Sequence, residues 1–419
     1  MSAPLSRRLG TGDAVVIGLG AMLGAGVFVV FAPAAAAAGA GLLVGLAIAA
    51  VVAYCNATSS ARLAARYPQS GGTYVYGRER LGPFWGYLAG WSFVVGKTAS
   101  CAAMALTVGL YLLPGHAHAV AVTAVVALTA LNYRGIHTST ALTRVIVIVI
   151  CVVLVAVVAV AALSGAAQPD QLGAGWGGAG WGGAGWGGAA GVLQAAGLLF
   201  FAFAGYARIA TLGEEVADPA RTIPRAIPLA LGITLAVYAA VAVSLLAVLG
   251  PERLATSSAP LADAVKACGA SALVPVVTAA AAVAALGSLL SLILGVSRTT
   301  LAMARDRHFP APLAAVHPRF AVPHRAEVAV GVVVAAIAAV ADVRAAIGFS
   351  SFAVLLYYGV ANASAWTLDR SPLRRAVPAV GLAGCLLLAV FLPVSSVLAG
   401  VAVVAAGAGI YAVRRVTAR

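Results

Sequence analysis

Three glycines interrupt the first apolar segment of the chain, in the stretch GAMLGAGVF at residues 20–28. Glycine inside a helix costs about 1 kcal/mol relative to alanine, so a helix here is weakest near its centre. Backbone groups that such a break frees within a bilayer must be bonded by protein, water or a ligand. Gly24, Ala25 and Gly26 would begin the outer half-helix with free N–H groups at its positive end, which can bind a carboxylate. The pattern predicts a solute site, and the alternative is a packing face on Gly20 and Gly24.

Lys97 is the second residue that could do chemistry. It lies about 15 residues, or roughly 22 Å of helix, from the start of its apolar segment at Gly82, which is too far for the side chain to reach an interface. An ammonium group at this depth costs about 3 kcal/mol and usually marks a function. All 12 Asp and Glu residues lie in loops or at the ends of apolar segments. Lys97 is therefore a candidate for coupling or for the counter-charge of a site, and a structural lysine bonded to helix carbonyls is the alternative.

A second break is predicted in the sixth apolar segment, where residues 200–207 read FFAFAGYA with Gly205 near the centre. Five apolar segments precede the long glycine-rich stretch, and the sixth follows it. Broken helices at corresponding positions of two five-helix halves are typical of inverted-repeat transporters, in which the solute binds at the interface of the repeats.

The composition is that of a polytopic membrane protein, with 62% hydrophobic and 9% charged residues. A spanning helix needs about 20 apolar residues. The fold expected is all-α with twelve transmembrane helices, at roughly residues 13–35, 40–61, 82–113, 118–133, 142–163, 191–213, 227–249, 272–303, 326–341, 345–366, 377–393 and 395–413.

The distribution of basic residues predicts the orientation. With the N-terminus inside, the outer loops hold only Arg253, Lys266 and Arg344, and Lys97 and Arg208 lie within spans, so the other 21 of the 26 Lys and Arg residues are cytoplasmic. The positive-inside rule thus predicts a multi-pass protein of the cytoplasmic (inner) membrane with both termini in the cytoplasm. The net charge of +14 is explained by contact with membrane lipid, and no nucleic-acid partner is expected.

The chain divides into four parts on this interpretation. Residues 1–163 form the first inverted repeat, with spans one to five, and residues 191–366 form the second, with spans six to ten. Residues 164–190 are an external loop that contains three copies of Gly-Ala-Gly-Trp-Gly, and residues 367–419 hold spans eleven and twelve and a cytoplasmic tail.

Catalytic and metal chemistry are not expected. The six histidines all lie in loops or at span ends, and the five cysteines give no metal or disulfide framework. No nucleophile and base form a pair within a span. The sequence predicts no enzyme, no metal and no cofactor.

Several motifs together resemble the amino acid/polyamine/organocation superfamily of permeases. They are residues 20–28, then YPQSGGTY at 67–74, FAGY at 203–206 with EEVADPARTIPRAI at 214–227, and the stretch from Ser297 to Pro310. The resemblance covers nearly the whole chain in the right order. It implies a five-plus-five inverted repeat, amino acids as the commonest substrates, and secondary transport by alternating access.

The resemblance also implies roles for individual residues. It puts the substrate carboxylate near Ala25 and Gly26, beside Gly24, and the substrate ammonium near carbonyls around Met22, Phe203 and Ala204. Other residues implied in the pocket are Phe201 as an aromatic gate, Gly205 at the second break, and Ser291 and Leu292 from span eight.

The coupling ion stays open. Some proton-coupled members carry a lysine in span five, but residues 145–163 contain no basic residue. Lys97 would then replace that lysine in a proton symporter, or the protein would be an exchanger. Backbone carbonyls with Ser288 would serve a sodium-dependent cycle. The alternatives in function are a polyamine or organocation carrier of the same fold and, from another class, a membrane receptor or channel.

Overall fold

The computed structural model is built of helices throughout the residues that it describes, which are 10–67, 71–135, 140–173, 188–206, 209 and 216–417. The long helices are α1 (Thr11–Met22), α4 (Leu42–Arg66), α6 (Pro83–Leu112), α7 (Ala117–Tyr133), α8 (Thr140–Leu163), α10 (Gly188–Phe203), α12 (Pro219–Thr256), α14 (Val274–Arg305), α15 (His324–Val340), α16 (Val343–Trp366), α17 (Pro372–Phe391) and α18 (Val394–Thr417). Shorter helices are α2 (Gly26–Val29), α3 (Phe31–Ala38), α5 (Thr73–Leu81), α9 (Asp170–Gly173) and α13 (Pro260–Ala267).

The predicted all-α membrane class is confirmed, and the count of twelve spans stays a prediction. Eleven helices among the described residues are long and apolar enough to cross a membrane. The expected ninth span corresponds to α15, which has 17 residues. At 1.5 Å per residue it is about 26 Å long, slightly less than a hydrocarbon core of about 30 Å.

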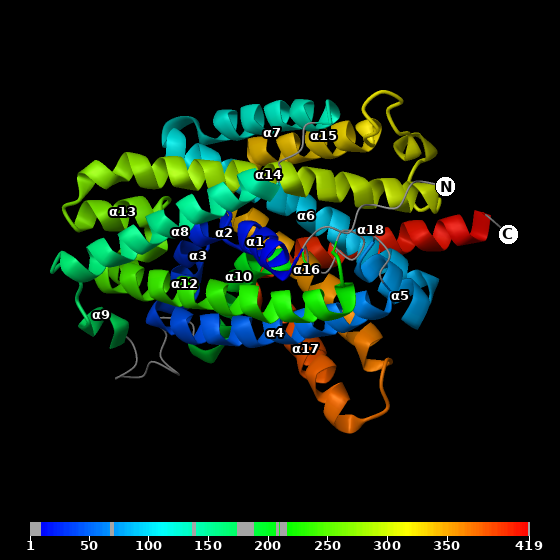
Figure 1. Ribbon diagram of the computed structural model, residues 1–419, viewed down its shortest axis with the longest axis horizontal. Helices are drawn as coiled ribbons and strands as arrows, with labels where there is room; N and C mark the ends of the chain where they lie inside the picture. The colour runs from blue at the N-terminus through cyan, green and yellow to red at the C-terminus, as the bar shows by residue number, and fades with distance from the viewer. Residues whose placement is uncertain are drawn as a thin grey trace.

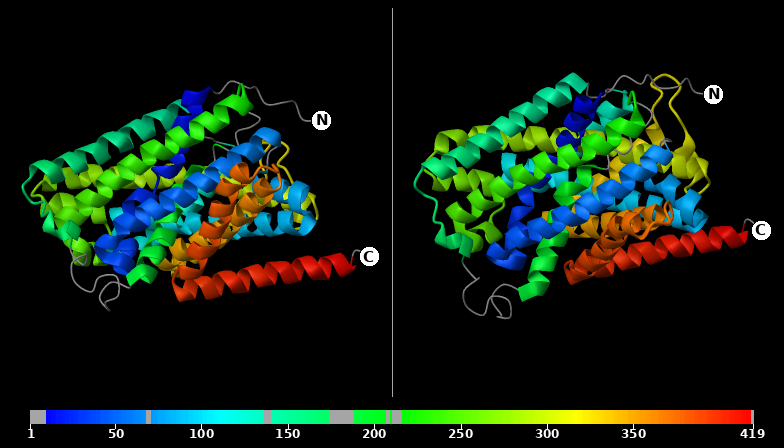
Figure 2. Two further views of the ribbon diagram at one scale, coloured as in Figure 1. Left: turned by 90° about the horizontal axis from the view of Figure 1, so that it is seen from below. Right: turned by 60° about the horizontal axis from the view of Figure 1, so that its bottom comes forward.

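The helices are arranged around the first span, which lies at the centre of the bundle. Figure 1 shows α1, α2 and α3 in the middle of the bundle, with α7 and α15 side by side along one edge and α17 projecting at the other. Helix α4 contacts α12, α6 contacts α14, and α7 contacts α15, so helices that the predicted repeat would make equivalent lie against each other. The last helix, α18, runs along the outside of the bundle (Figure 2).

Helix α18 docks through its backbone more than through its side chains. The Tyr87 hydroxyl donates a hydrogen bond to the Gly407 carbonyl at 2.9 Å, and the Trp91 ring N–H donates one to the Val403 carbonyl at 3.0 Å. A Cβ on Gly407 would lie 2.5 Å from the Trp91 ring, and one on Gly400 would lie 2.1 Å from a ring carbon of Phe352. Because Gly400 and Gly407 have no side chain, α18 can approach the aromatic rings of α6 and α16 closely.

The predicted break in the first span is present. Helix α1 ends at Met22 and α2 begins at Gly26, with a bend and a turn between them. The N–H of Leu23 bonds to the Leu19 carbonyl and the N–H of Phe28 to the Ala25 carbonyl, and no backbone hydrogen bond is recorded from the N–H groups of residues 24–27 within the described chain. The ladder of helix hydrogen bonds is thus interrupted over one turn.

The sixth span also leaves the α-helical conformation where it was predicted to. Helix α10 ends at Phe203 and continues as a 3₁₀ turn at Ala204–Tyr206. Residues 207–208 and 210–215, which include Arg208, Glu214 and Glu215, lie outside the described part. The tryptophans of the Gly/Trp loop also lie outside it.

The two breaks fit against each other because Gly205 and Gly26 have no side chain. A Cβ on Gly205 would lie 2.4 Å from the Ala21 carbonyl oxygen, and one on Gly26 would lie 2.8 Å from the Ala202 Cβ. The buried hydroxyl of Tyr238, on α12, lies within hydrogen-bond distance of the carbonyls of Met22 and Ala202 and thereby bridges the two broken helices.

One acidic residue is buried, although the sequence places it only at a span end. The side chain of Glu327, in the first turn of α15, is 0% exposed, and neither carboxylate oxygen has a hydrogen-bond partner within the described chain. Thr129 and Asn132, on the adjacent α7, also have buried oxygens without partners. Burial of an unpaired carboxylate is costly unless the group is protonated or bound to a cation.

The bridging role of Tyr238 predicts the effect of its removal. Tyr238→Phe leaves two buried carbonyls without this donor and should destabilise the protein by about 1–3 kcal/mol, because unsatisfied buried polar groups carry a desolvation penalty. Thermal unfolding in detergent measures the loss. Tyr54→Phe is the matched control, since Tyr54 is 50% exposed. Equal stability of both variants would contradict the bridge.

The burial of Glu327 predicts that its replacement stabilises the protein, in contrast to the replacement of Tyr238. At alkaline pH the carboxylate is ionised without a hydrogen-bond partner among the described residues. Glu327→Gln should then unfold at a higher temperature than the unmodified protein, because burial of the charge costs more than its attraction to Arg298 offsets. Glu79→Gln is the control, because the side chain of Glu79 is 46% exposed. A lower unfolding temperature for Glu327→Gln would mean that the carboxylate has a stabilising partner.

Candidate functional site

Most of the predicted site residues come together where the two breaks meet. Met22, Ala25 and Gly26 on the first span are buried, and so are Phe203 and Ala204 on the sixth. Gly205 contacts the backbone of Ala21 and Met22. The centre of the bundle therefore combines freed backbone groups from two spans with mostly apolar side chains.

Gly24 and Gly26 both serve close packing. A Cβ on Gly24 would lie 2.0 Å from the Ser288 hydroxyl on α14, and Gly26 faces Ala202 on α10. The packing alternative was stated for Gly20 and Gly24, and both positions are close-packed, since a Cβ on Gly20 would lie 3.1 Å from the side chain of Thr143 on α8. Close packing does not conflict with a solute site, because a carboxylate would be bound by the backbone N–H groups and not by the Cα atoms.

Lys97 reaches the second break. Its side chain is 8% exposed, and its Nζ donates a hydrogen bond of 3.5 Å to the carbonyl of Ala204. The Tyr358 hydroxyl donates to the same carbonyl at 3.3 Å. This carbonyl lies at the C-terminal end of α10, which carries the negative end of the helix dipole. No salt bridge of Lys97 is present among the described residues, so a carbonyl takes the place of an acidic partner.

Aromatic rings surround the same region. The ring centroids of Phe203 and Tyr238 are 5.1 Å apart, and those of Phe200 and Tyr358 are 5.8 Å apart. Phe201, the expected gate, is 8% exposed. These rings limit the space next to the breaks and keep it apolar.

The α14 residues divide between two faces of the helix. Ser288 faces α1, where its hydroxyl donates to the Gly20 carbonyl at 3.4 Å. Ser291 is exposed and bonds to the Gly287 carbonyl of its own helix at 3.1 Å, and Leu292 is half-buried. The structure therefore brings Ser288 into contact with the first span, whereas no contact of Ser291 with either break is present among the described residues.

Two tyrosines and a polar cluster were missed by sequence reasoning. Tyr238 bonds to the Met22 carbonyl, and Tyr358 shares the Ala204 carbonyl with Lys97. Behind Tyr358, the side-chain amide of Asn362 donates to the Asn56 side-chain oxygen at 2.6 Å and to the Tyr358 carbonyl at 3.0 Å. Tyrosine and asparagine deep within apolar segments were the available signal, because such groups need partners when buried.

Comparison of the sequence with known proteins identifies its relatives. Residues 9–413 match the family model described as amino acid permease. A protein of Mycobacterium tuberculosis named an uncharacterized transporter is 70% identical over 417 residues, which are 99% of this chain and 93% of that protein. The branched-chain amino acid permease of Bacillus subtilis is 26% identical over 76% of this chain and 72% of its own. The human cationic amino acid transporter 4 is 28% identical over 85% of this chain and 59% of its own.

A match across nearly the whole chain shows the family, and the pair of broken helices is the structural feature that agrees with it. The relatives are membrane transporters, which points away from enzymatic activity. The chain belongs to the amino acid permease family within the amino acid/polyamine/organocation superfamily.

Proposed function

We propose that this protein is a secondary active transporter that carries amino acids across the cytoplasmic membrane by alternating access, as a proton symporter or an exchanger. The observation that supports it most is the contact of the two broken helices at Gly205, Ala21 and Met22. Helix breaks that meet in the middle of a membrane protein offer N–H and C=O groups to a solute that has both a carboxylate and an ammonium group.

The charges of the site favour this substrate class over a polyamine. The freed N–H groups of residues 24–27 suit a carboxylate, and Lys97, when protonated, adds a positive charge at the second break. A dication would need acidic side chains, and Lys97 would repel it. The names of the relatives, which include permeases for branched-chain and for cationic amino acids, agree with amino acids as the class.

Lys97 is proposed as the coupling residue. Its hydrogen bond to the Ala204 carbonyl joins α6 to the end of α10 while the ammonium group is protonated. Loss of the proton would weaken this bond, because a charged donor forms a stronger hydrogen bond than a neutral one. Protonation of Lys97 would thus favour one arrangement of the sixth span over another.

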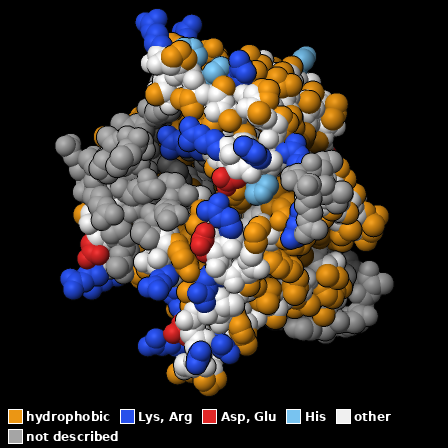
Figure 3. Space-filling view, turned by 90° about the vertical axis from the view of Figure 1, so that its right-hand side faces the viewer, with side chains coloured by type: hydrophobic (Ala, Val, Ile, Leu, Met, Phe, Trp, Pro, Cys, Tyr) orange, Lys and Arg blue, Asp and Glu red, His pale blue; other side chains and the backbone are white. Residues whose placement is uncertain are grey.

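The orientation is inferred from the loops. Most of the basic residues lie on the side of the bundle where α18 ends, and Figure 3 shows many Lys and Arg side chains and few acidic ones on that face. The positive-inside rule makes this the cytoplasmic face, with both termini on it.

The first test of the proposal is transport by purified protein in proteoliposomes. At least one zwitterionic or basic amino acid should be accumulated or exchanged, because the site offers partners for both backbone charges of such a solute. The assay is uptake and counterflow with a panel of radiolabelled amino acids. Empty liposomes are the control. Uptake of a diamine without uptake of any amino acid would favour the polyamine carrier instead.

The second test concerns Lys97. Lys97→Ala and Lys97→Arg should both abolish accumulation driven by a pH gradient, because alanine has no proton to exchange and guanidinium does not deprotonate in this range. Counterflow at fixed pH should survive, since it needs no net proton movement. Lys266→Ala is the matched control, because Lys266 is exposed and lies near Asp263 at 3.9 Å. Normal gradient-driven uptake by Lys97→Ala would reduce Lys97 to a structural residue.

A further inference from the structure

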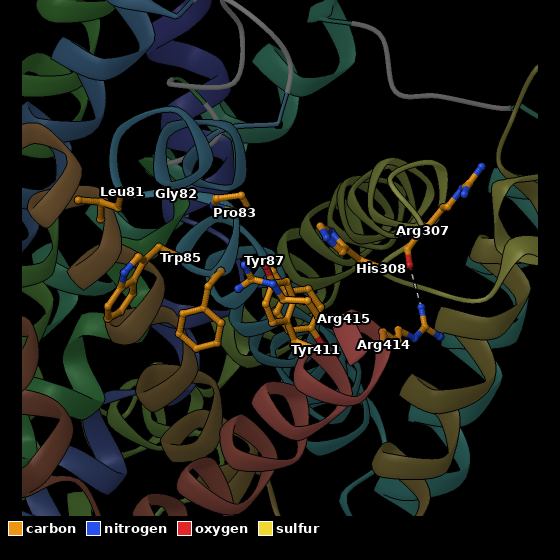
Figure 4. A pocket seen from close by; sticks show the side chains of 11 residues that line it. Leu81, Gly82, Pro83, Trp85, Tyr87, Arg307, His308, Tyr411, Arg414 and Arg415 are labelled. Atoms are coloured by element: carbon orange, nitrogen blue, oxygen red, sulfur yellow. Dashed lines mark hydrogen bonds between the residues drawn. The ribbon is translucent and has the colours of Figure 1, made fainter. Parts of the chain in front are cut away.

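A pocket of about 440 Å³ lies at the end of the bundle where α6 begins and α18 ends. It is distant in the chain from both helix breaks, and it belongs to the side that the positive-inside rule assigns to the cytoplasm. Its lining comes from the end of α5 and the start of α6, from the residues that follow α14 and from the last turns of α18 (Figure 4). Three segments that are far apart in sequence thus enclose one cavity.

The lining is strongly cationic. Arg307, Arg414 and Arg415 contribute to it, and no acidic side chain is among the residues that line it. The nearest carboxylate, Asp306, is already engaged, since it accepts hydrogen bonds from Arg78 at 3.1 Å and from the Tyr74 hydroxyl. Guanidinium groups remain charged at any physiological pH. Three guanidinium groups thus line the pocket, and no carboxylate is among its lining residues.

The positive charges near the pocket also affect the pKa of His308. Burial lowers the pKa of His308, and the positive charges of Arg414 and Arg78 lower it further, against the opposing effect of Asp306. The imidazole is thus predominantly neutral at pH 7. An anion in the pocket would relieve the repulsion among these groups.

The floor of the pocket is aromatic and firmly held. The ring centroid of Tyr411 lies 5.0 Å from that of Tyr87 and 5.4 Å from that of Phe84, and the Tyr87 ring lies 5.1 Å from His308. Tyr87 is 1% exposed, and its hydroxyl is fixed on the Gly407 carbonyl. The rings of Tyr87, Tyr411 and Phe84 thus form a packed apolar surface beside the arginines.

The rim of the pocket is held in place by the main chain. Arg307 has a positive φ of 60°, which is unfavourable for a residue with a side chain. Its carbonyl accepts a hydrogen bond of 2.9 Å from Arg414 (Figure 4), which ties the segment after α14 to the end of α18. Strained residues persist only where their surroundings hold them and often occur at ligand sites.

A lipid-facing surface adjoins the pocket. Val394, Leu398, Val401 and Val413 of α18 are 53–73% exposed, and Trp85, beside the pocket, is 45% exposed. Arginines at the last turn of a helix would by themselves be explained by the helix dipole. That explanation accounts neither for a cavity with an aromatic floor nor for the contribution of Arg307 from another segment.

We propose that this pocket binds a phosphate-bearing anion, with Arg307, Arg414 and Arg415 around the phosphate and the rings of Tyr87 and Tyr411 beneath it. Basic pockets between helices on the cytoplasmic side are suited to lipid phosphate groups. The exposed apolar face of α18 would accommodate acyl chains, which favours the headgroup of an anionic phospholipid over free phosphate as the source.

The test compares thermal unfolding of the full-length protein in nanodiscs of phosphatidylcholine with increasing fractions of phosphatidylglycerol. A parallel series uses phosphatidylcholine nanodiscs with inorganic phosphate at constant ionic strength. The pocket variant is Arg307→Gln with Arg415→Gln, which keeps the bond from Arg414 to the Arg307 carbonyl. Arg319→Gln with Arg325→Gln is the matched control, since it removes the same charge from exposed positions outside the pocket.

Phosphatidylglycerol should raise the unfolding temperature of the unmodified protein and of the control variant. The pocket variant should lose most of this shift at every fraction, because it lacks two of the three guanidinium groups that would surround the phosphate, whereas the control variant keeps all three. A shift with inorganic phosphate that the pocket variant alone loses would support the site and make free phosphate its source. Equal shifts in all three proteins, or no shift in any, would overturn the proposal.

Discussion

The structure depends on one close contact, in which the backbone of the first span meets the backbone of the sixth at the level of Gly205. A Cβ at this position would lie 2.4 Å from a main-chain oxygen, so no other residue fits without movement of one of the two helices. The contact occurs where both helices have lost their regular hydrogen bonds. Two segments that are individually unfavourable in a bilayer thereby stabilise each other's position.

Carbonyls of the two broken spans accept hydrogen bonds from side chains of four other helices. Tyr238 from α12, Ser288 from α14, Tyr358 from α16 and Lys97 from α6 each bond to a carbonyl of the broken spans. A change in the conformation of either break must therefore alter contacts with most of the bundle. This is the kind of link that alternating access requires, because a local change at the solute is transmitted to packed helices.

The positions of both breaks could be predicted from glycine and its neighbours, because the cost of glycine in a helix is a local property. The partners of the freed carbonyls could not, since they depend on which face each distant helix turns toward the centre. Ser291 and Ser288 are less than one turn apart, yet only Ser288 contacts the first span. Similarly, the position of Glu327 at the end of an apolar segment gave no indication of its burial, which results from packing of α15 against α7 and α14.

The docking of α18 through carbonyls and glycines has a consequence for how this helix can vary. Tyr87 and Trp91 bond to main-chain oxygens, which every residue type supplies. The buried Ser396, which packs against Gly348, must remain small, and so must Gly400 and Gly407. These two glycines are seven residues apart, so they occupy the same face two turns from each other. Most other positions of α18 before its final turn face outward and need only be apolar. Apolar substitutions at these outward-facing positions would leave the docking contacts of α18 intact. The side chains that this helix presents to lipid can therefore change without a change in its position.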